Sequence, residues 1–306
     1  MDSRRLGYDR PMDDPATIRP MRPEDADPAA EVMIGGGWGD RRKFLAFAVR
    51  HPACRPFVAE VDGRIAGTGV ATVNGAVGWV GMIFVDEALR GRGLGTTLTT
   101  TVMDALEAAG CRSMALLASP LGRPVYDRLG FSAEMDYRVL VVPAGGRPEE
   151  AIGVAGAIDG AADEDGASRL RAYAPADLPA ILALDRAATG EDRSHLLREV
   201  VGPDETVVAV RVSGELVGFD ARVPWGTHPT VAPALPDGIR LLDARRRRSA
   251  AGSDVRTAIP EVNRAGLTVL ENLGWQGERG LTRMVRGASI DWHPDAIWGQ
   301  ISYAIG

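Results

Sequence analysis

The stretch that decides the fold is a glycine-rich turn at residues 90–96, which reads Arg90-Gly91-Arg92-Gly93-Leu94-Gly95-Thr96. A mostly apolar segment, Ala76 to Val85, precedes the turn and predicts a strand in the middle of a sheet. From Leu94 to Ala109 the apolar residues fall on one helical face, and Gly110 ends that helix. Glycines at a strand-to-helix turn let backbone N–H groups approach an anion, and the helix N-terminus adds partial positive charge. The turn therefore fits a pyrophosphate.

Two other phosphate-binding motifs differ from this turn. A dinucleotide-binding fold would show Gly-x-Gly-x-x-Gly, and a P-loop would show Lys followed by Ser or Thr after its last glycine, but neither is present. A glycine-rich turn is a weak signal when it stands alone, because many such loops are only tight connections. The residues further downstream therefore have to support the interpretation.

The spacing Arg90-x-x-Gly93-x-Gly95, behind the hydrophobic strand Met82 to Val85, resembles the acyl-coenzyme A signature of the GNAT superfamily of N-acetyltransferases. A second block, Ala118 to Phe131, resembles the segment in which such enzymes place a tyrosine, here Tyr126, ahead of a Gly-Phe pair. The matching blocks span Ile18 to Leu140, and together they are far more specific than either motif alone. The resemblance implies acyl transfer from acetyl-coenzyme A, or another acyl-coenzyme A, with no metal.

The resemblance also assigns residues to the cofactor. The pantetheine arm would lie in a gap beside the strand before the signature, the loop amides would hold the pyrophosphate, and Ser119 stands where many members have an asparagine that contacts the cofactor. The expected cofactor-binding residues are Ile83, Phe84, Val85, Arg90, Gly91, Arg92, Gly93, Leu94, Gly95, Thr96 and Ser119.

Tyr126 is the expected general acid, because a phenol within reach of the thioester sulfur can protonate the departing thiolate. Packing on the apolar side of a short helix is its other interpretation. Trp38, in the glycine-rich loop Gly35 to Asp40, lies where the superfamily usually builds its acceptor site, and it either covers a substrate or packs. No general base can be identified from the sequence, because the nearby carboxylates fit solvated or turn positions. A chain of water molecules could take that role.

The sequence repeats itself in its second half. Ile18 to Ala26 is similar to Leu170 to Leu178, and a strand hairpin follows each of them. We therefore expect two tandem GNAT folds of mixed α/β (α+β) class, each a largely antiparallel twisted sheet flanked by helices. The expected plan is a lead-in at 1–16, a catalytic domain at 17–143, a linker at 144–167 and a degenerate domain at 168–306.

The second half departs from the signature. Its counterpart, Val231 to Gly238, holds prolines and no paired glycines, and Leu270 takes the tyrosine position. The half resembles the degenerate C-terminal domain of some bacterial tandem GNAT proteins and is expected to have lost coenzyme A binding. Its tail, Ile297 to Gly306, is apolar to the end, which predicts docking rather than fraying.

Composition limits the remaining possibilities. The 306 residues are 45% hydrophobic and 25% charged, as in a soluble globular protein, and the formal charge of −6 argues against a nucleic-acid partner. No membrane span or signal peptide is legible, so we expect a cytoplasmic protein. The run Arg245 to Arg248 is interpreted as a solvated helix end. Neither the two cysteines nor the histidines show metal spacing, and nothing marks an oligomer interface.

The leading hypothesis is acetyl transfer to an amine of a small molecule. A carrier-protein or aminoacyl-tRNA donor is the alternative within enzymes, and a resistance protein that sequesters a compound without turnover is the alternative outside them. The acceptor itself cannot be read from a fold that supports many chemistries.

Overall fold

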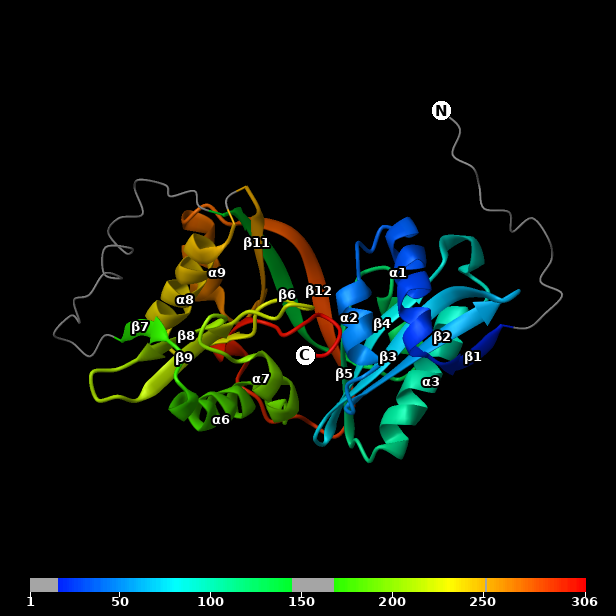
Figure 1. Ribbon diagram of the computed structural model, residues 1–306, viewed down its shortest axis with the longest axis horizontal. Helices are drawn as coiled ribbons and strands as arrows, with labels where there is room; N and C mark the ends of the chain where they lie inside the picture. The colour runs from blue at the N-terminus through cyan, green and yellow to red at the C-terminus, as the bar shows by residue number, and fades with distance from the viewer. Residues whose placement is uncertain (1–15, 145–167, 251) are drawn as a thin grey trace. The chain divides into compact units, whose positions relative to one another are not determined.

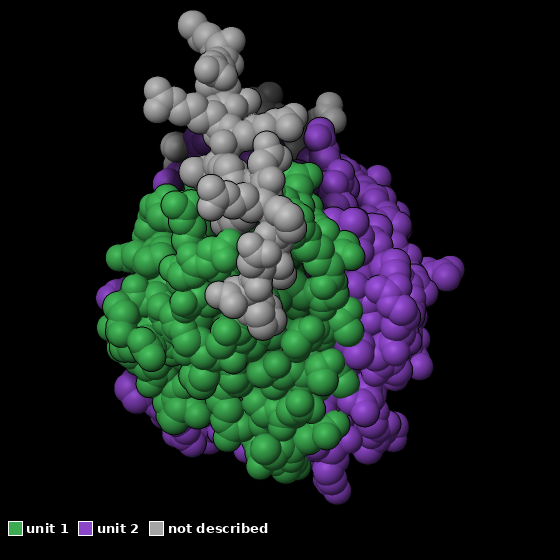
Figure 2. All heavy atoms as spheres, turned by 90° about the vertical axis from the view of Figure 1, so that its right-hand side faces the viewer, with its two compact units in different colours: residues 1–73, 79–110 green, residues 74–78, 111–306 purple. Residues whose placement is uncertain are grey.

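The computed structural model describes residues 16–144, 168–250 and 252–306, and Figure 1 labels most of their helices and strands. The expected lead-in and linker lie outside the described residues, apart from Ala16 and Ala144 at their borders. Chain contacts divide the molecule into two compact units, coloured in Figure 2: residues 1–73 with 79–110, and residues 74–78 with 111–306. Both units combine helices with sheets that are mainly antiparallel, which confirms the expected mixed α/β class. The expected domain bounds remain a prediction.

The first unit is built around strands in the order β1-β2-β3-β4. The β2–β3 hairpin turns at Asp62 and Gly63, both with positive φ, as the Asp-Gly pair predicts. Its elements are β1 (Thr17–Pro20), η1 (Pro23–Asp25), α1 (Ala26–Gly35), α2 (Arg42–Ala48), β2 (Cys54–Val61), β3 (Arg64–Asn74), β4 (Val77–Val85), η2 (Glu87–Leu89) and α3 (Leu94–Ala108).

Helix α3 packs closely on β3 because two glycines of that strand leave room for its side chains. Leu94, Leu98, Val102 and Leu106, spaced four residues apart, are buried on one face of the helix. A Cβ added at Gly67 would lie 2.9 Å from Leu98 Cδ1, and one at Gly69 would lie 3.0 Å from Val102 Cγ2. The helix start, and the turn before it, are therefore held against the sheet.

The second unit holds two groups of strands, in the orders β5-β12-β6-β11 and β13-β10-β9-β8-β7. Its strands are β5 (Ser113–Ala118), β6 (Ser132–Pro143), β7 (Arg169–Ala172), β8 (Thr206–Val210), β9 (Leu216–Ala221), β10 (Thr230–Val231), β11 (Asp254–Pro260), β12 (Gln276–Gly287) and β13 (Ile297–Gly299). Its helices are α4 (Arg123–Arg128), η5 (Pro175–Asp177), α6 (Leu178–Thr189), α7 (Ser194–Val200), α8 (Leu235–Arg248), α9 (Arg264–Asn272) and η6 (Pro294–Ala296).

Strand β6 comes from the first half of the sequence, but among the described strands its two partners both come from the second half. It lies between β12 and β11, antiparallel to both. Strand β12 in turn lies between β5 and β6. The halves thus exchange strands, which explains why the chain after Cys111 clusters with the second half of the sequence.

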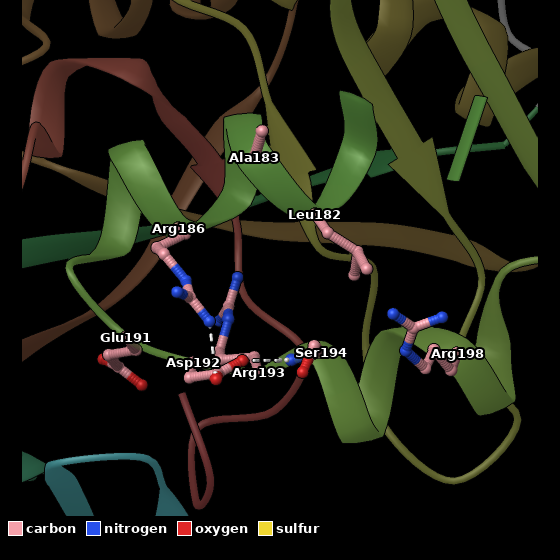
Figure 3. A pocket seen from close by; sticks show the side chains of 8 residues that line it. All are labelled: Leu182, Ala183, Arg186, Glu191, Asp192, Arg193, Ser194 and Arg198. Carbon is pink, nitrogen blue, oxygen red and sulfur yellow. Dashed lines mark hydrogen bonds and ion pairs between the residues drawn. The ribbon is translucent and has the colours of Figure 1, made fainter. Parts of the chain in front are cut away.

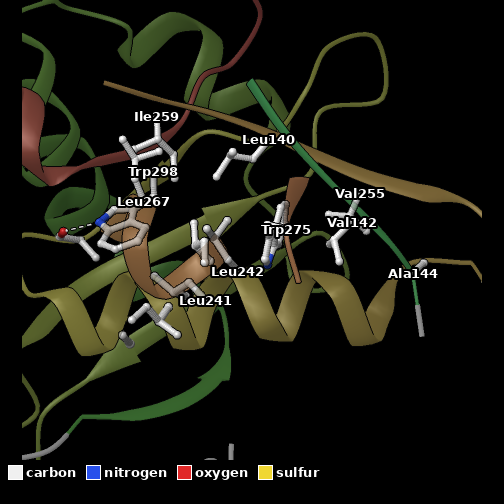
Figure 4. Close-up of a cluster of buried hydrophobic side chains, with 14 of the residues drawn as sticks. Leu140, Val142, Ala144, Leu241, Leu242, Val255, Ile259, Leu267, Trp275 and Trp298 are labelled. Carbon is white, nitrogen blue, oxygen red and sulfur yellow. Dashed lines mark hydrogen bonds between the residues drawn. The ribbon is translucent and has the colours of Figure 1, made fainter. Parts of the chain in front are cut away.

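A hydrophobic core fixes this exchange, and Figure 4 shows it beneath β6 and β11. Leu140 and Val142 of β6 contribute to it together with Leu241 and Leu242 of α8. Trp298 of the C-terminal tail is fully enclosed in the same core, at 1% exposure. The predicted docking of the tail is therefore confirmed.

One contact is duplicated in detail. Arg19 Nη1 and Nη2 lie 2.6 and 3.0 Å from the carboxylate oxygens of Asp25, and the Arg22 N–H donates to the same carboxylate at 2.7 Å. In the second unit, Arg171 reaches Asp177 at 2.6 and 2.7 Å, and the Ala174 N–H donates at 2.7 Å. The two sets occupy matching positions of the sequence repeat, at the turn from the first strand into the first helix.

Candidate active site

Strand β4 is irregular where the resemblance places the cofactor. Met82 has a φ of 52°, which is strained for a side-chain-bearing residue, and its carbonyl accepts a hydrogen bond of 2.8 Å from Thr68 Oγ1. This kink could not be predicted from the sequence, because methionine does not favour positive φ. Residues 83–85 follow directly, so the kink sets the direction of the strand end that is expected to hold pantetheine.

The side chains beyond the kink face opposite ways. Ile83 Cδ1 would lie 3.1 Å from a Cβ at Gly69, on the side of α3. Phe84 turns the other way, where its ring meets the Trp38 ring edge-on with centroids 5.4 Å apart. A Cβ added at Gly36 would lie 2.6 Å from the Phe84 ring, so that position must be glycine for the ring to sit there. Trp38 and Phe84, predicted for different roles, thus belong to one aromatic contact in the first unit.

The predicted signature turn has its backbone in the conformation that its glycines allow. Gly91 and Gly93 have φ values of 79° and 83°, and a Cβ at either would meet no atom within 4 Å. Asp86 Oδ1 accepts the Ala88 N–H at 2.9 Å before the turn, and Arg90 Nε donates to Val85 O at 3.1 Å. Asp86 thus orders the chain just after β4, and the Arg90 side chain ties the turn to the last residue of that strand.

The first turn of α3 presents backbone donors. Gly93 caps the helix without a side-chain acceptor, and no acidic residue stands in the first turn. Thr97 is the first residue whose N–H returns to the cap, at 3.0 Å from Gly93 O, so Leu94, Gly95 and Thr96 precede the intrahelical ladder. Arg92 is exposed and forms no ion pair within the described ranges. Free amides, a positive helix end and an exposed guanidinium together suit a phosphate group.

The other two predicted residues, Ser119 and Tyr126, lie in the second unit. Ser119 Oγ accepts the Gly122 N–H at 3.2 Å, in the turn that precedes the short helix α4. Tyr126 is half-buried, with its ring 6.1 Å from that of Phe131, and loss of solvent raises the pKa of its hydroxyl to about 12. The phenol is therefore fully protonated at neutral pH.

Helix α8, the counterpart of α3, starts differently. Pro236 removes one N–H from its first turn, and Asp237 places a buried carboxylate there that accepts a hydrogen bond from Ser168 Oγ. The chain itself thus supplies the negative charge at this helix start. The expected loss of coenzyme A binding remains a prediction that this arrangement supports.

The arginine run at the end of α8 corrects one expectation. Arg245 is not solvated: it is 3% exposed, and its Nε lies 2.9 Å from Asp220 Oδ1. Burial opposes ionisation of Asp220, but Arg245 and His228 hold the pKa of that carboxyl well below its usual range. The helical spacing of Arg245 with the buried Leu241 and Leu242 was the available signal.

A pocket of about 340 Å³ opens in the second unit between α6 and α7 (Figure 3). Its charged side chains largely pair with each other or with the chain: Arg186 with Asp192 at 2.5 Å, and Arg193 with Asp185. Among the described residues, no three His, Cys, Asp or Glu side chains are grouped to hold a metal ion. No helix in the described part of the chain is long and apolar enough to cross a membrane.

Comparison with known proteins matches the sequence and its fold to acetyltransferases. Residues 24–131 match the acetyltransferase (GNAT) family, and residues 181–299 match a second acetyltransferase (GNAT) domain family. Together these matches cover most of the chain. The chain therefore belongs to the GNAT acetyltransferases and carries two GNAT domains in tandem, and acyl-coenzyme A is the donor class of this family. No curated protein matches the sequence significantly.

Solved structures share the fold at low sequence identity. A proposed acetyltransferase from Pyrococcus horikoshii is 19% identical with a TM-score of 0.75, covering 100% of this chain and 99% of that one. A GCN5-related N-acetyltransferase from Sphaerobacter thermophilus is 16% identical with a TM-score of 0.62, covering 91% and 98%. A tandem GNAT protein from the clavulanic acid biosynthesis pathway is 15% identical with a TM-score of 0.61, covering 90% and 99%.

Proposed function

We propose that the protein transfers an acetyl group from acetyl-coenzyme A to an amine of a small molecule, with Tyr126 as the general acid. The observation that carries this proposal is the turn before α3. There, two glycines with positive φ and open surroundings precede a helix start. The amides of this helix start and the nearby arginine would bind an anion.

The residues of the first unit would bind the donor. The amides of the signature turn would bind the pyrophosphate, with charge from Arg90 and Arg92, and the backbone of Ile83 to Val85 would pair with the pantetheine arm as an added strand would. Ser119 would contact the cofactor through its hydroxyl, which can still donate a hydrogen bond while it accepts one from Gly122.

Tyr126 would act when the carbon–sulfur bond breaks. The amine nitrogen bonds to the thioester carbonyl carbon, the sulfur leaves with the electron pair of the C–S bond, and the phenol gives that sulfur its proton. Solvent returns a proton to the tyrosinate and takes the excess proton from the new amide nitrogen. Because the pKa of Tyr126 is about 12, the donor form is present at every physiological pH.

The acceptor would meet the aromatic contact of Trp38 and Phe84. Trp38 is 38% exposed although its ring packs on Phe84, so one part of the indole is held while another faces outward. An aromatic surface of this kind suits an amine, because a cation near an indole face gains about 0.5–2 kcal/mol.

The test is a screen of small-molecule amines with acetyl-coenzyme A, followed by thiol release and by mass of the product. For an accepted amine, Tyr126→Phe should lower kcat by about 10²- to 10⁴-fold with little change in donor affinity. Tyr173→Phe, a half-buried tyrosine outside the proposed machinery, is the matched control and should retain full activity.

Two results would overturn the proposal. Full turnover in Tyr126→Phe would remove the phenol from the chemistry, and calorimetry without binding of acetyl-coenzyme A would remove the donor. If the enzyme acylated proteins but no small amine in the screen, the acceptor would be a protein amine instead of a small molecule.

A further inference from the structure

The C-terminal tail adds a strand to the second GNAT fold. Strand β13 pairs antiparallel with β10, the strand that precedes helix α8 as β4 precedes α3. Ala232 N donates to Ala296 O at 2.9 Å, and Thr227 N donates to Ile301 O at 2.7 Å. The same strand packs against β11, where Thr257 Oγ1 donates to Trp298 O.

Three glycines of the second unit, Gly226, Gly238 and Gly266, make room for this tail, and Gly299 lets the tail itself approach its neighbour closely. A Cβ at Gly238 would lie 2.0 Å from the Trp298 ring, and one at Gly266 would lie 2.6 Å from it. A Cβ at Gly226 would lie 2.3 Å from Ile301 O, and one at Gly299 would lie 2.3 Å from His228 O. A single added methyl group at any of these positions would therefore overlap its neighbour, so the tail and the unit fit closely.

Trp298 anchors the tail at the start of α8. Its ring lies against Gly238 in the first turns of that helix, it is 1% exposed, and its Nε1 donates to Ala232 O at 2.9 Å, the bond drawn in Figure 4. The neighbouring Asp237 already supplies the helix start with a carboxylate. The chain itself thus pairs with the edge of β10, places a carboxylate at the start of α8 and fills the apolar space beside them.

We infer that the C-terminal strand Ile297–Gly299 is an internal ligand of the second GNAT fold, which occupies the place that the pantetheine arm takes beside β4 in the proposed function. The inference rests on the proposed function for that equivalence. Its consequence is that each chain binds one acyl-coenzyme A, and that the second fold needs no cofactor to complete its sheet.

Hydrogen–deuterium exchange of the full chain, with and without acetyl-coenzyme A, tests this inference. Without the cofactor, the amides of Thr227 and Ala232 should exchange at least about 100-fold more slowly than in an unstructured peptide. Addition of acetyl-coenzyme A should leave residues 227–238 and 296–301 unchanged. Calorimetry should give one site per chain.

The outcomes separate the two proposals. Fast exchange at 227–232 without cofactor, slower exchange there on addition of acetyl-coenzyme A, or two sites per chain would each overturn the internal-ligand inference. Residues 83–96 report on the proposed function in the same experiment, because acetyl-coenzyme A should slow their exchange. If acetyl-coenzyme A did not slow exchange at residues 83–96 while residues 227–232 stayed protected, the donor site would be rejected and the position of the tail would be retained.

Discussion

Helices α3 and α8 hold matching places in the sequence repeat, yet their first turns have opposite surroundings. At the start of α3, a Cβ added at Gly91 or Gly93 would meet no atom within 4 Å, and no carboxylate stands in the first turn. At the start of α8, Gly238 lies against a tryptophan ring and Asp237 supplies a negative charge. The glycines before α3 thus leave open space, whereas Gly238 of α8 leaves room for the chain's own tail. The difference shows that two helix starts in matching places of a sequence repeat can have different neighbours and different local charge.

Among the variants that test this comparison, the largest effect is expected for Gly93→Glu. A residue with a side chain is strained at a φ of 83°, and a carboxylate at this helix start would repel a phosphate. Calorimetry should show affinity for acetyl-coenzyme A reduced by about 100-fold or more, equivalent to about 3 kcal/mol. Gly110→Glu, at a φ of 82° at the other end of the same helix, should bind normally. Equal loss in both variants would point to strain rather than to the site.

Gly238→Ala tests the other helix start, and its sign is decisive. Alanine favours a helix over glycine by about 1 kcal/mol, so the substitution would stabilise α8 if nothing lay beside it. Because the added Cβ would lie 2.0 Å from Trp298, we expect a net loss of about 1–3 kcal/mol in the free energy of unfolding, measured by urea denaturation. Gly202→Ala, whose Cβ would meet nothing within 4 Å, should lose no stability. A stabilised Gly238→Ala protein would contradict the tail contact.

The duplicated Arg–Asp contacts should respond alike. Asp25→Asn and Asp177→Asn should each lower the free energy of unfolding by about 1–2 kcal/mol, because each aspartate accepts two guanidinium bonds and one amide bond. The folded pKa of each carboxyl is lowered, so its stabilisation is present above the ordinary pKa near 3.9 and is lost as pH falls toward the folded value. The deficit of both variants should therefore shrink as the pH falls below about 4. A deficit in only one variant would end the equivalence of the two turns.

The smallest effect is expected for Arg92→Gln. Arg92 is exposed, so its contribution to phosphate binding is screened by solvent, and the KM for acetyl-coenzyme A should rise only about two- to five-fold with kcat unchanged. Steady-state kinetics at two salt concentrations measure this, and the difference from the parent should narrow at high salt. Arg64→Gln, on the β2–β3 hairpin, is the control and should leave the KM unchanged. A loss that is independent of salt would argue against a charge effect.

The sequence predicted local features well where residue type and conformation are coupled. The signature turn, its helix, the Asp62-Gly63 hairpin and the repeat of the first turn all depend on glycines, capping carboxylates or periodicity within a few residues. The GNAT resemblance extended this to the fold class. The residues expected to bind the cofactor remain predictions, and the structure supplies their surroundings.

Long-range pairing could not be predicted from the same patterns. The alternation in β6 shows that one of its faces is buried, but it does not say which strands flank it, so its exchange between β12 and β11 was missed. The kink at Met82 was missed because tertiary contacts hold it against the preference of the residue. Burial of Arg245 was missed because its partner, Asp220, lies 25 residues away in sequence.

The exchange of β6 also has a consequence in time. A ribosome completes β6 at Pro143, but both neighbours of this strand are encoded later, and β12 ends about 140 residues downstream. At roughly 5–20 residues per second, the nascent strand waits about 6 to 23 s for β11 with both of its edges unpaired, and one edge stays unpaired until β12 is made after about 7 to 30 s. Unpaired strand edges promote aggregation, so the nascent chain is prone to aggregate during this interval. A GNAT domain whose strands all came from one half of the sequence would not have this delay.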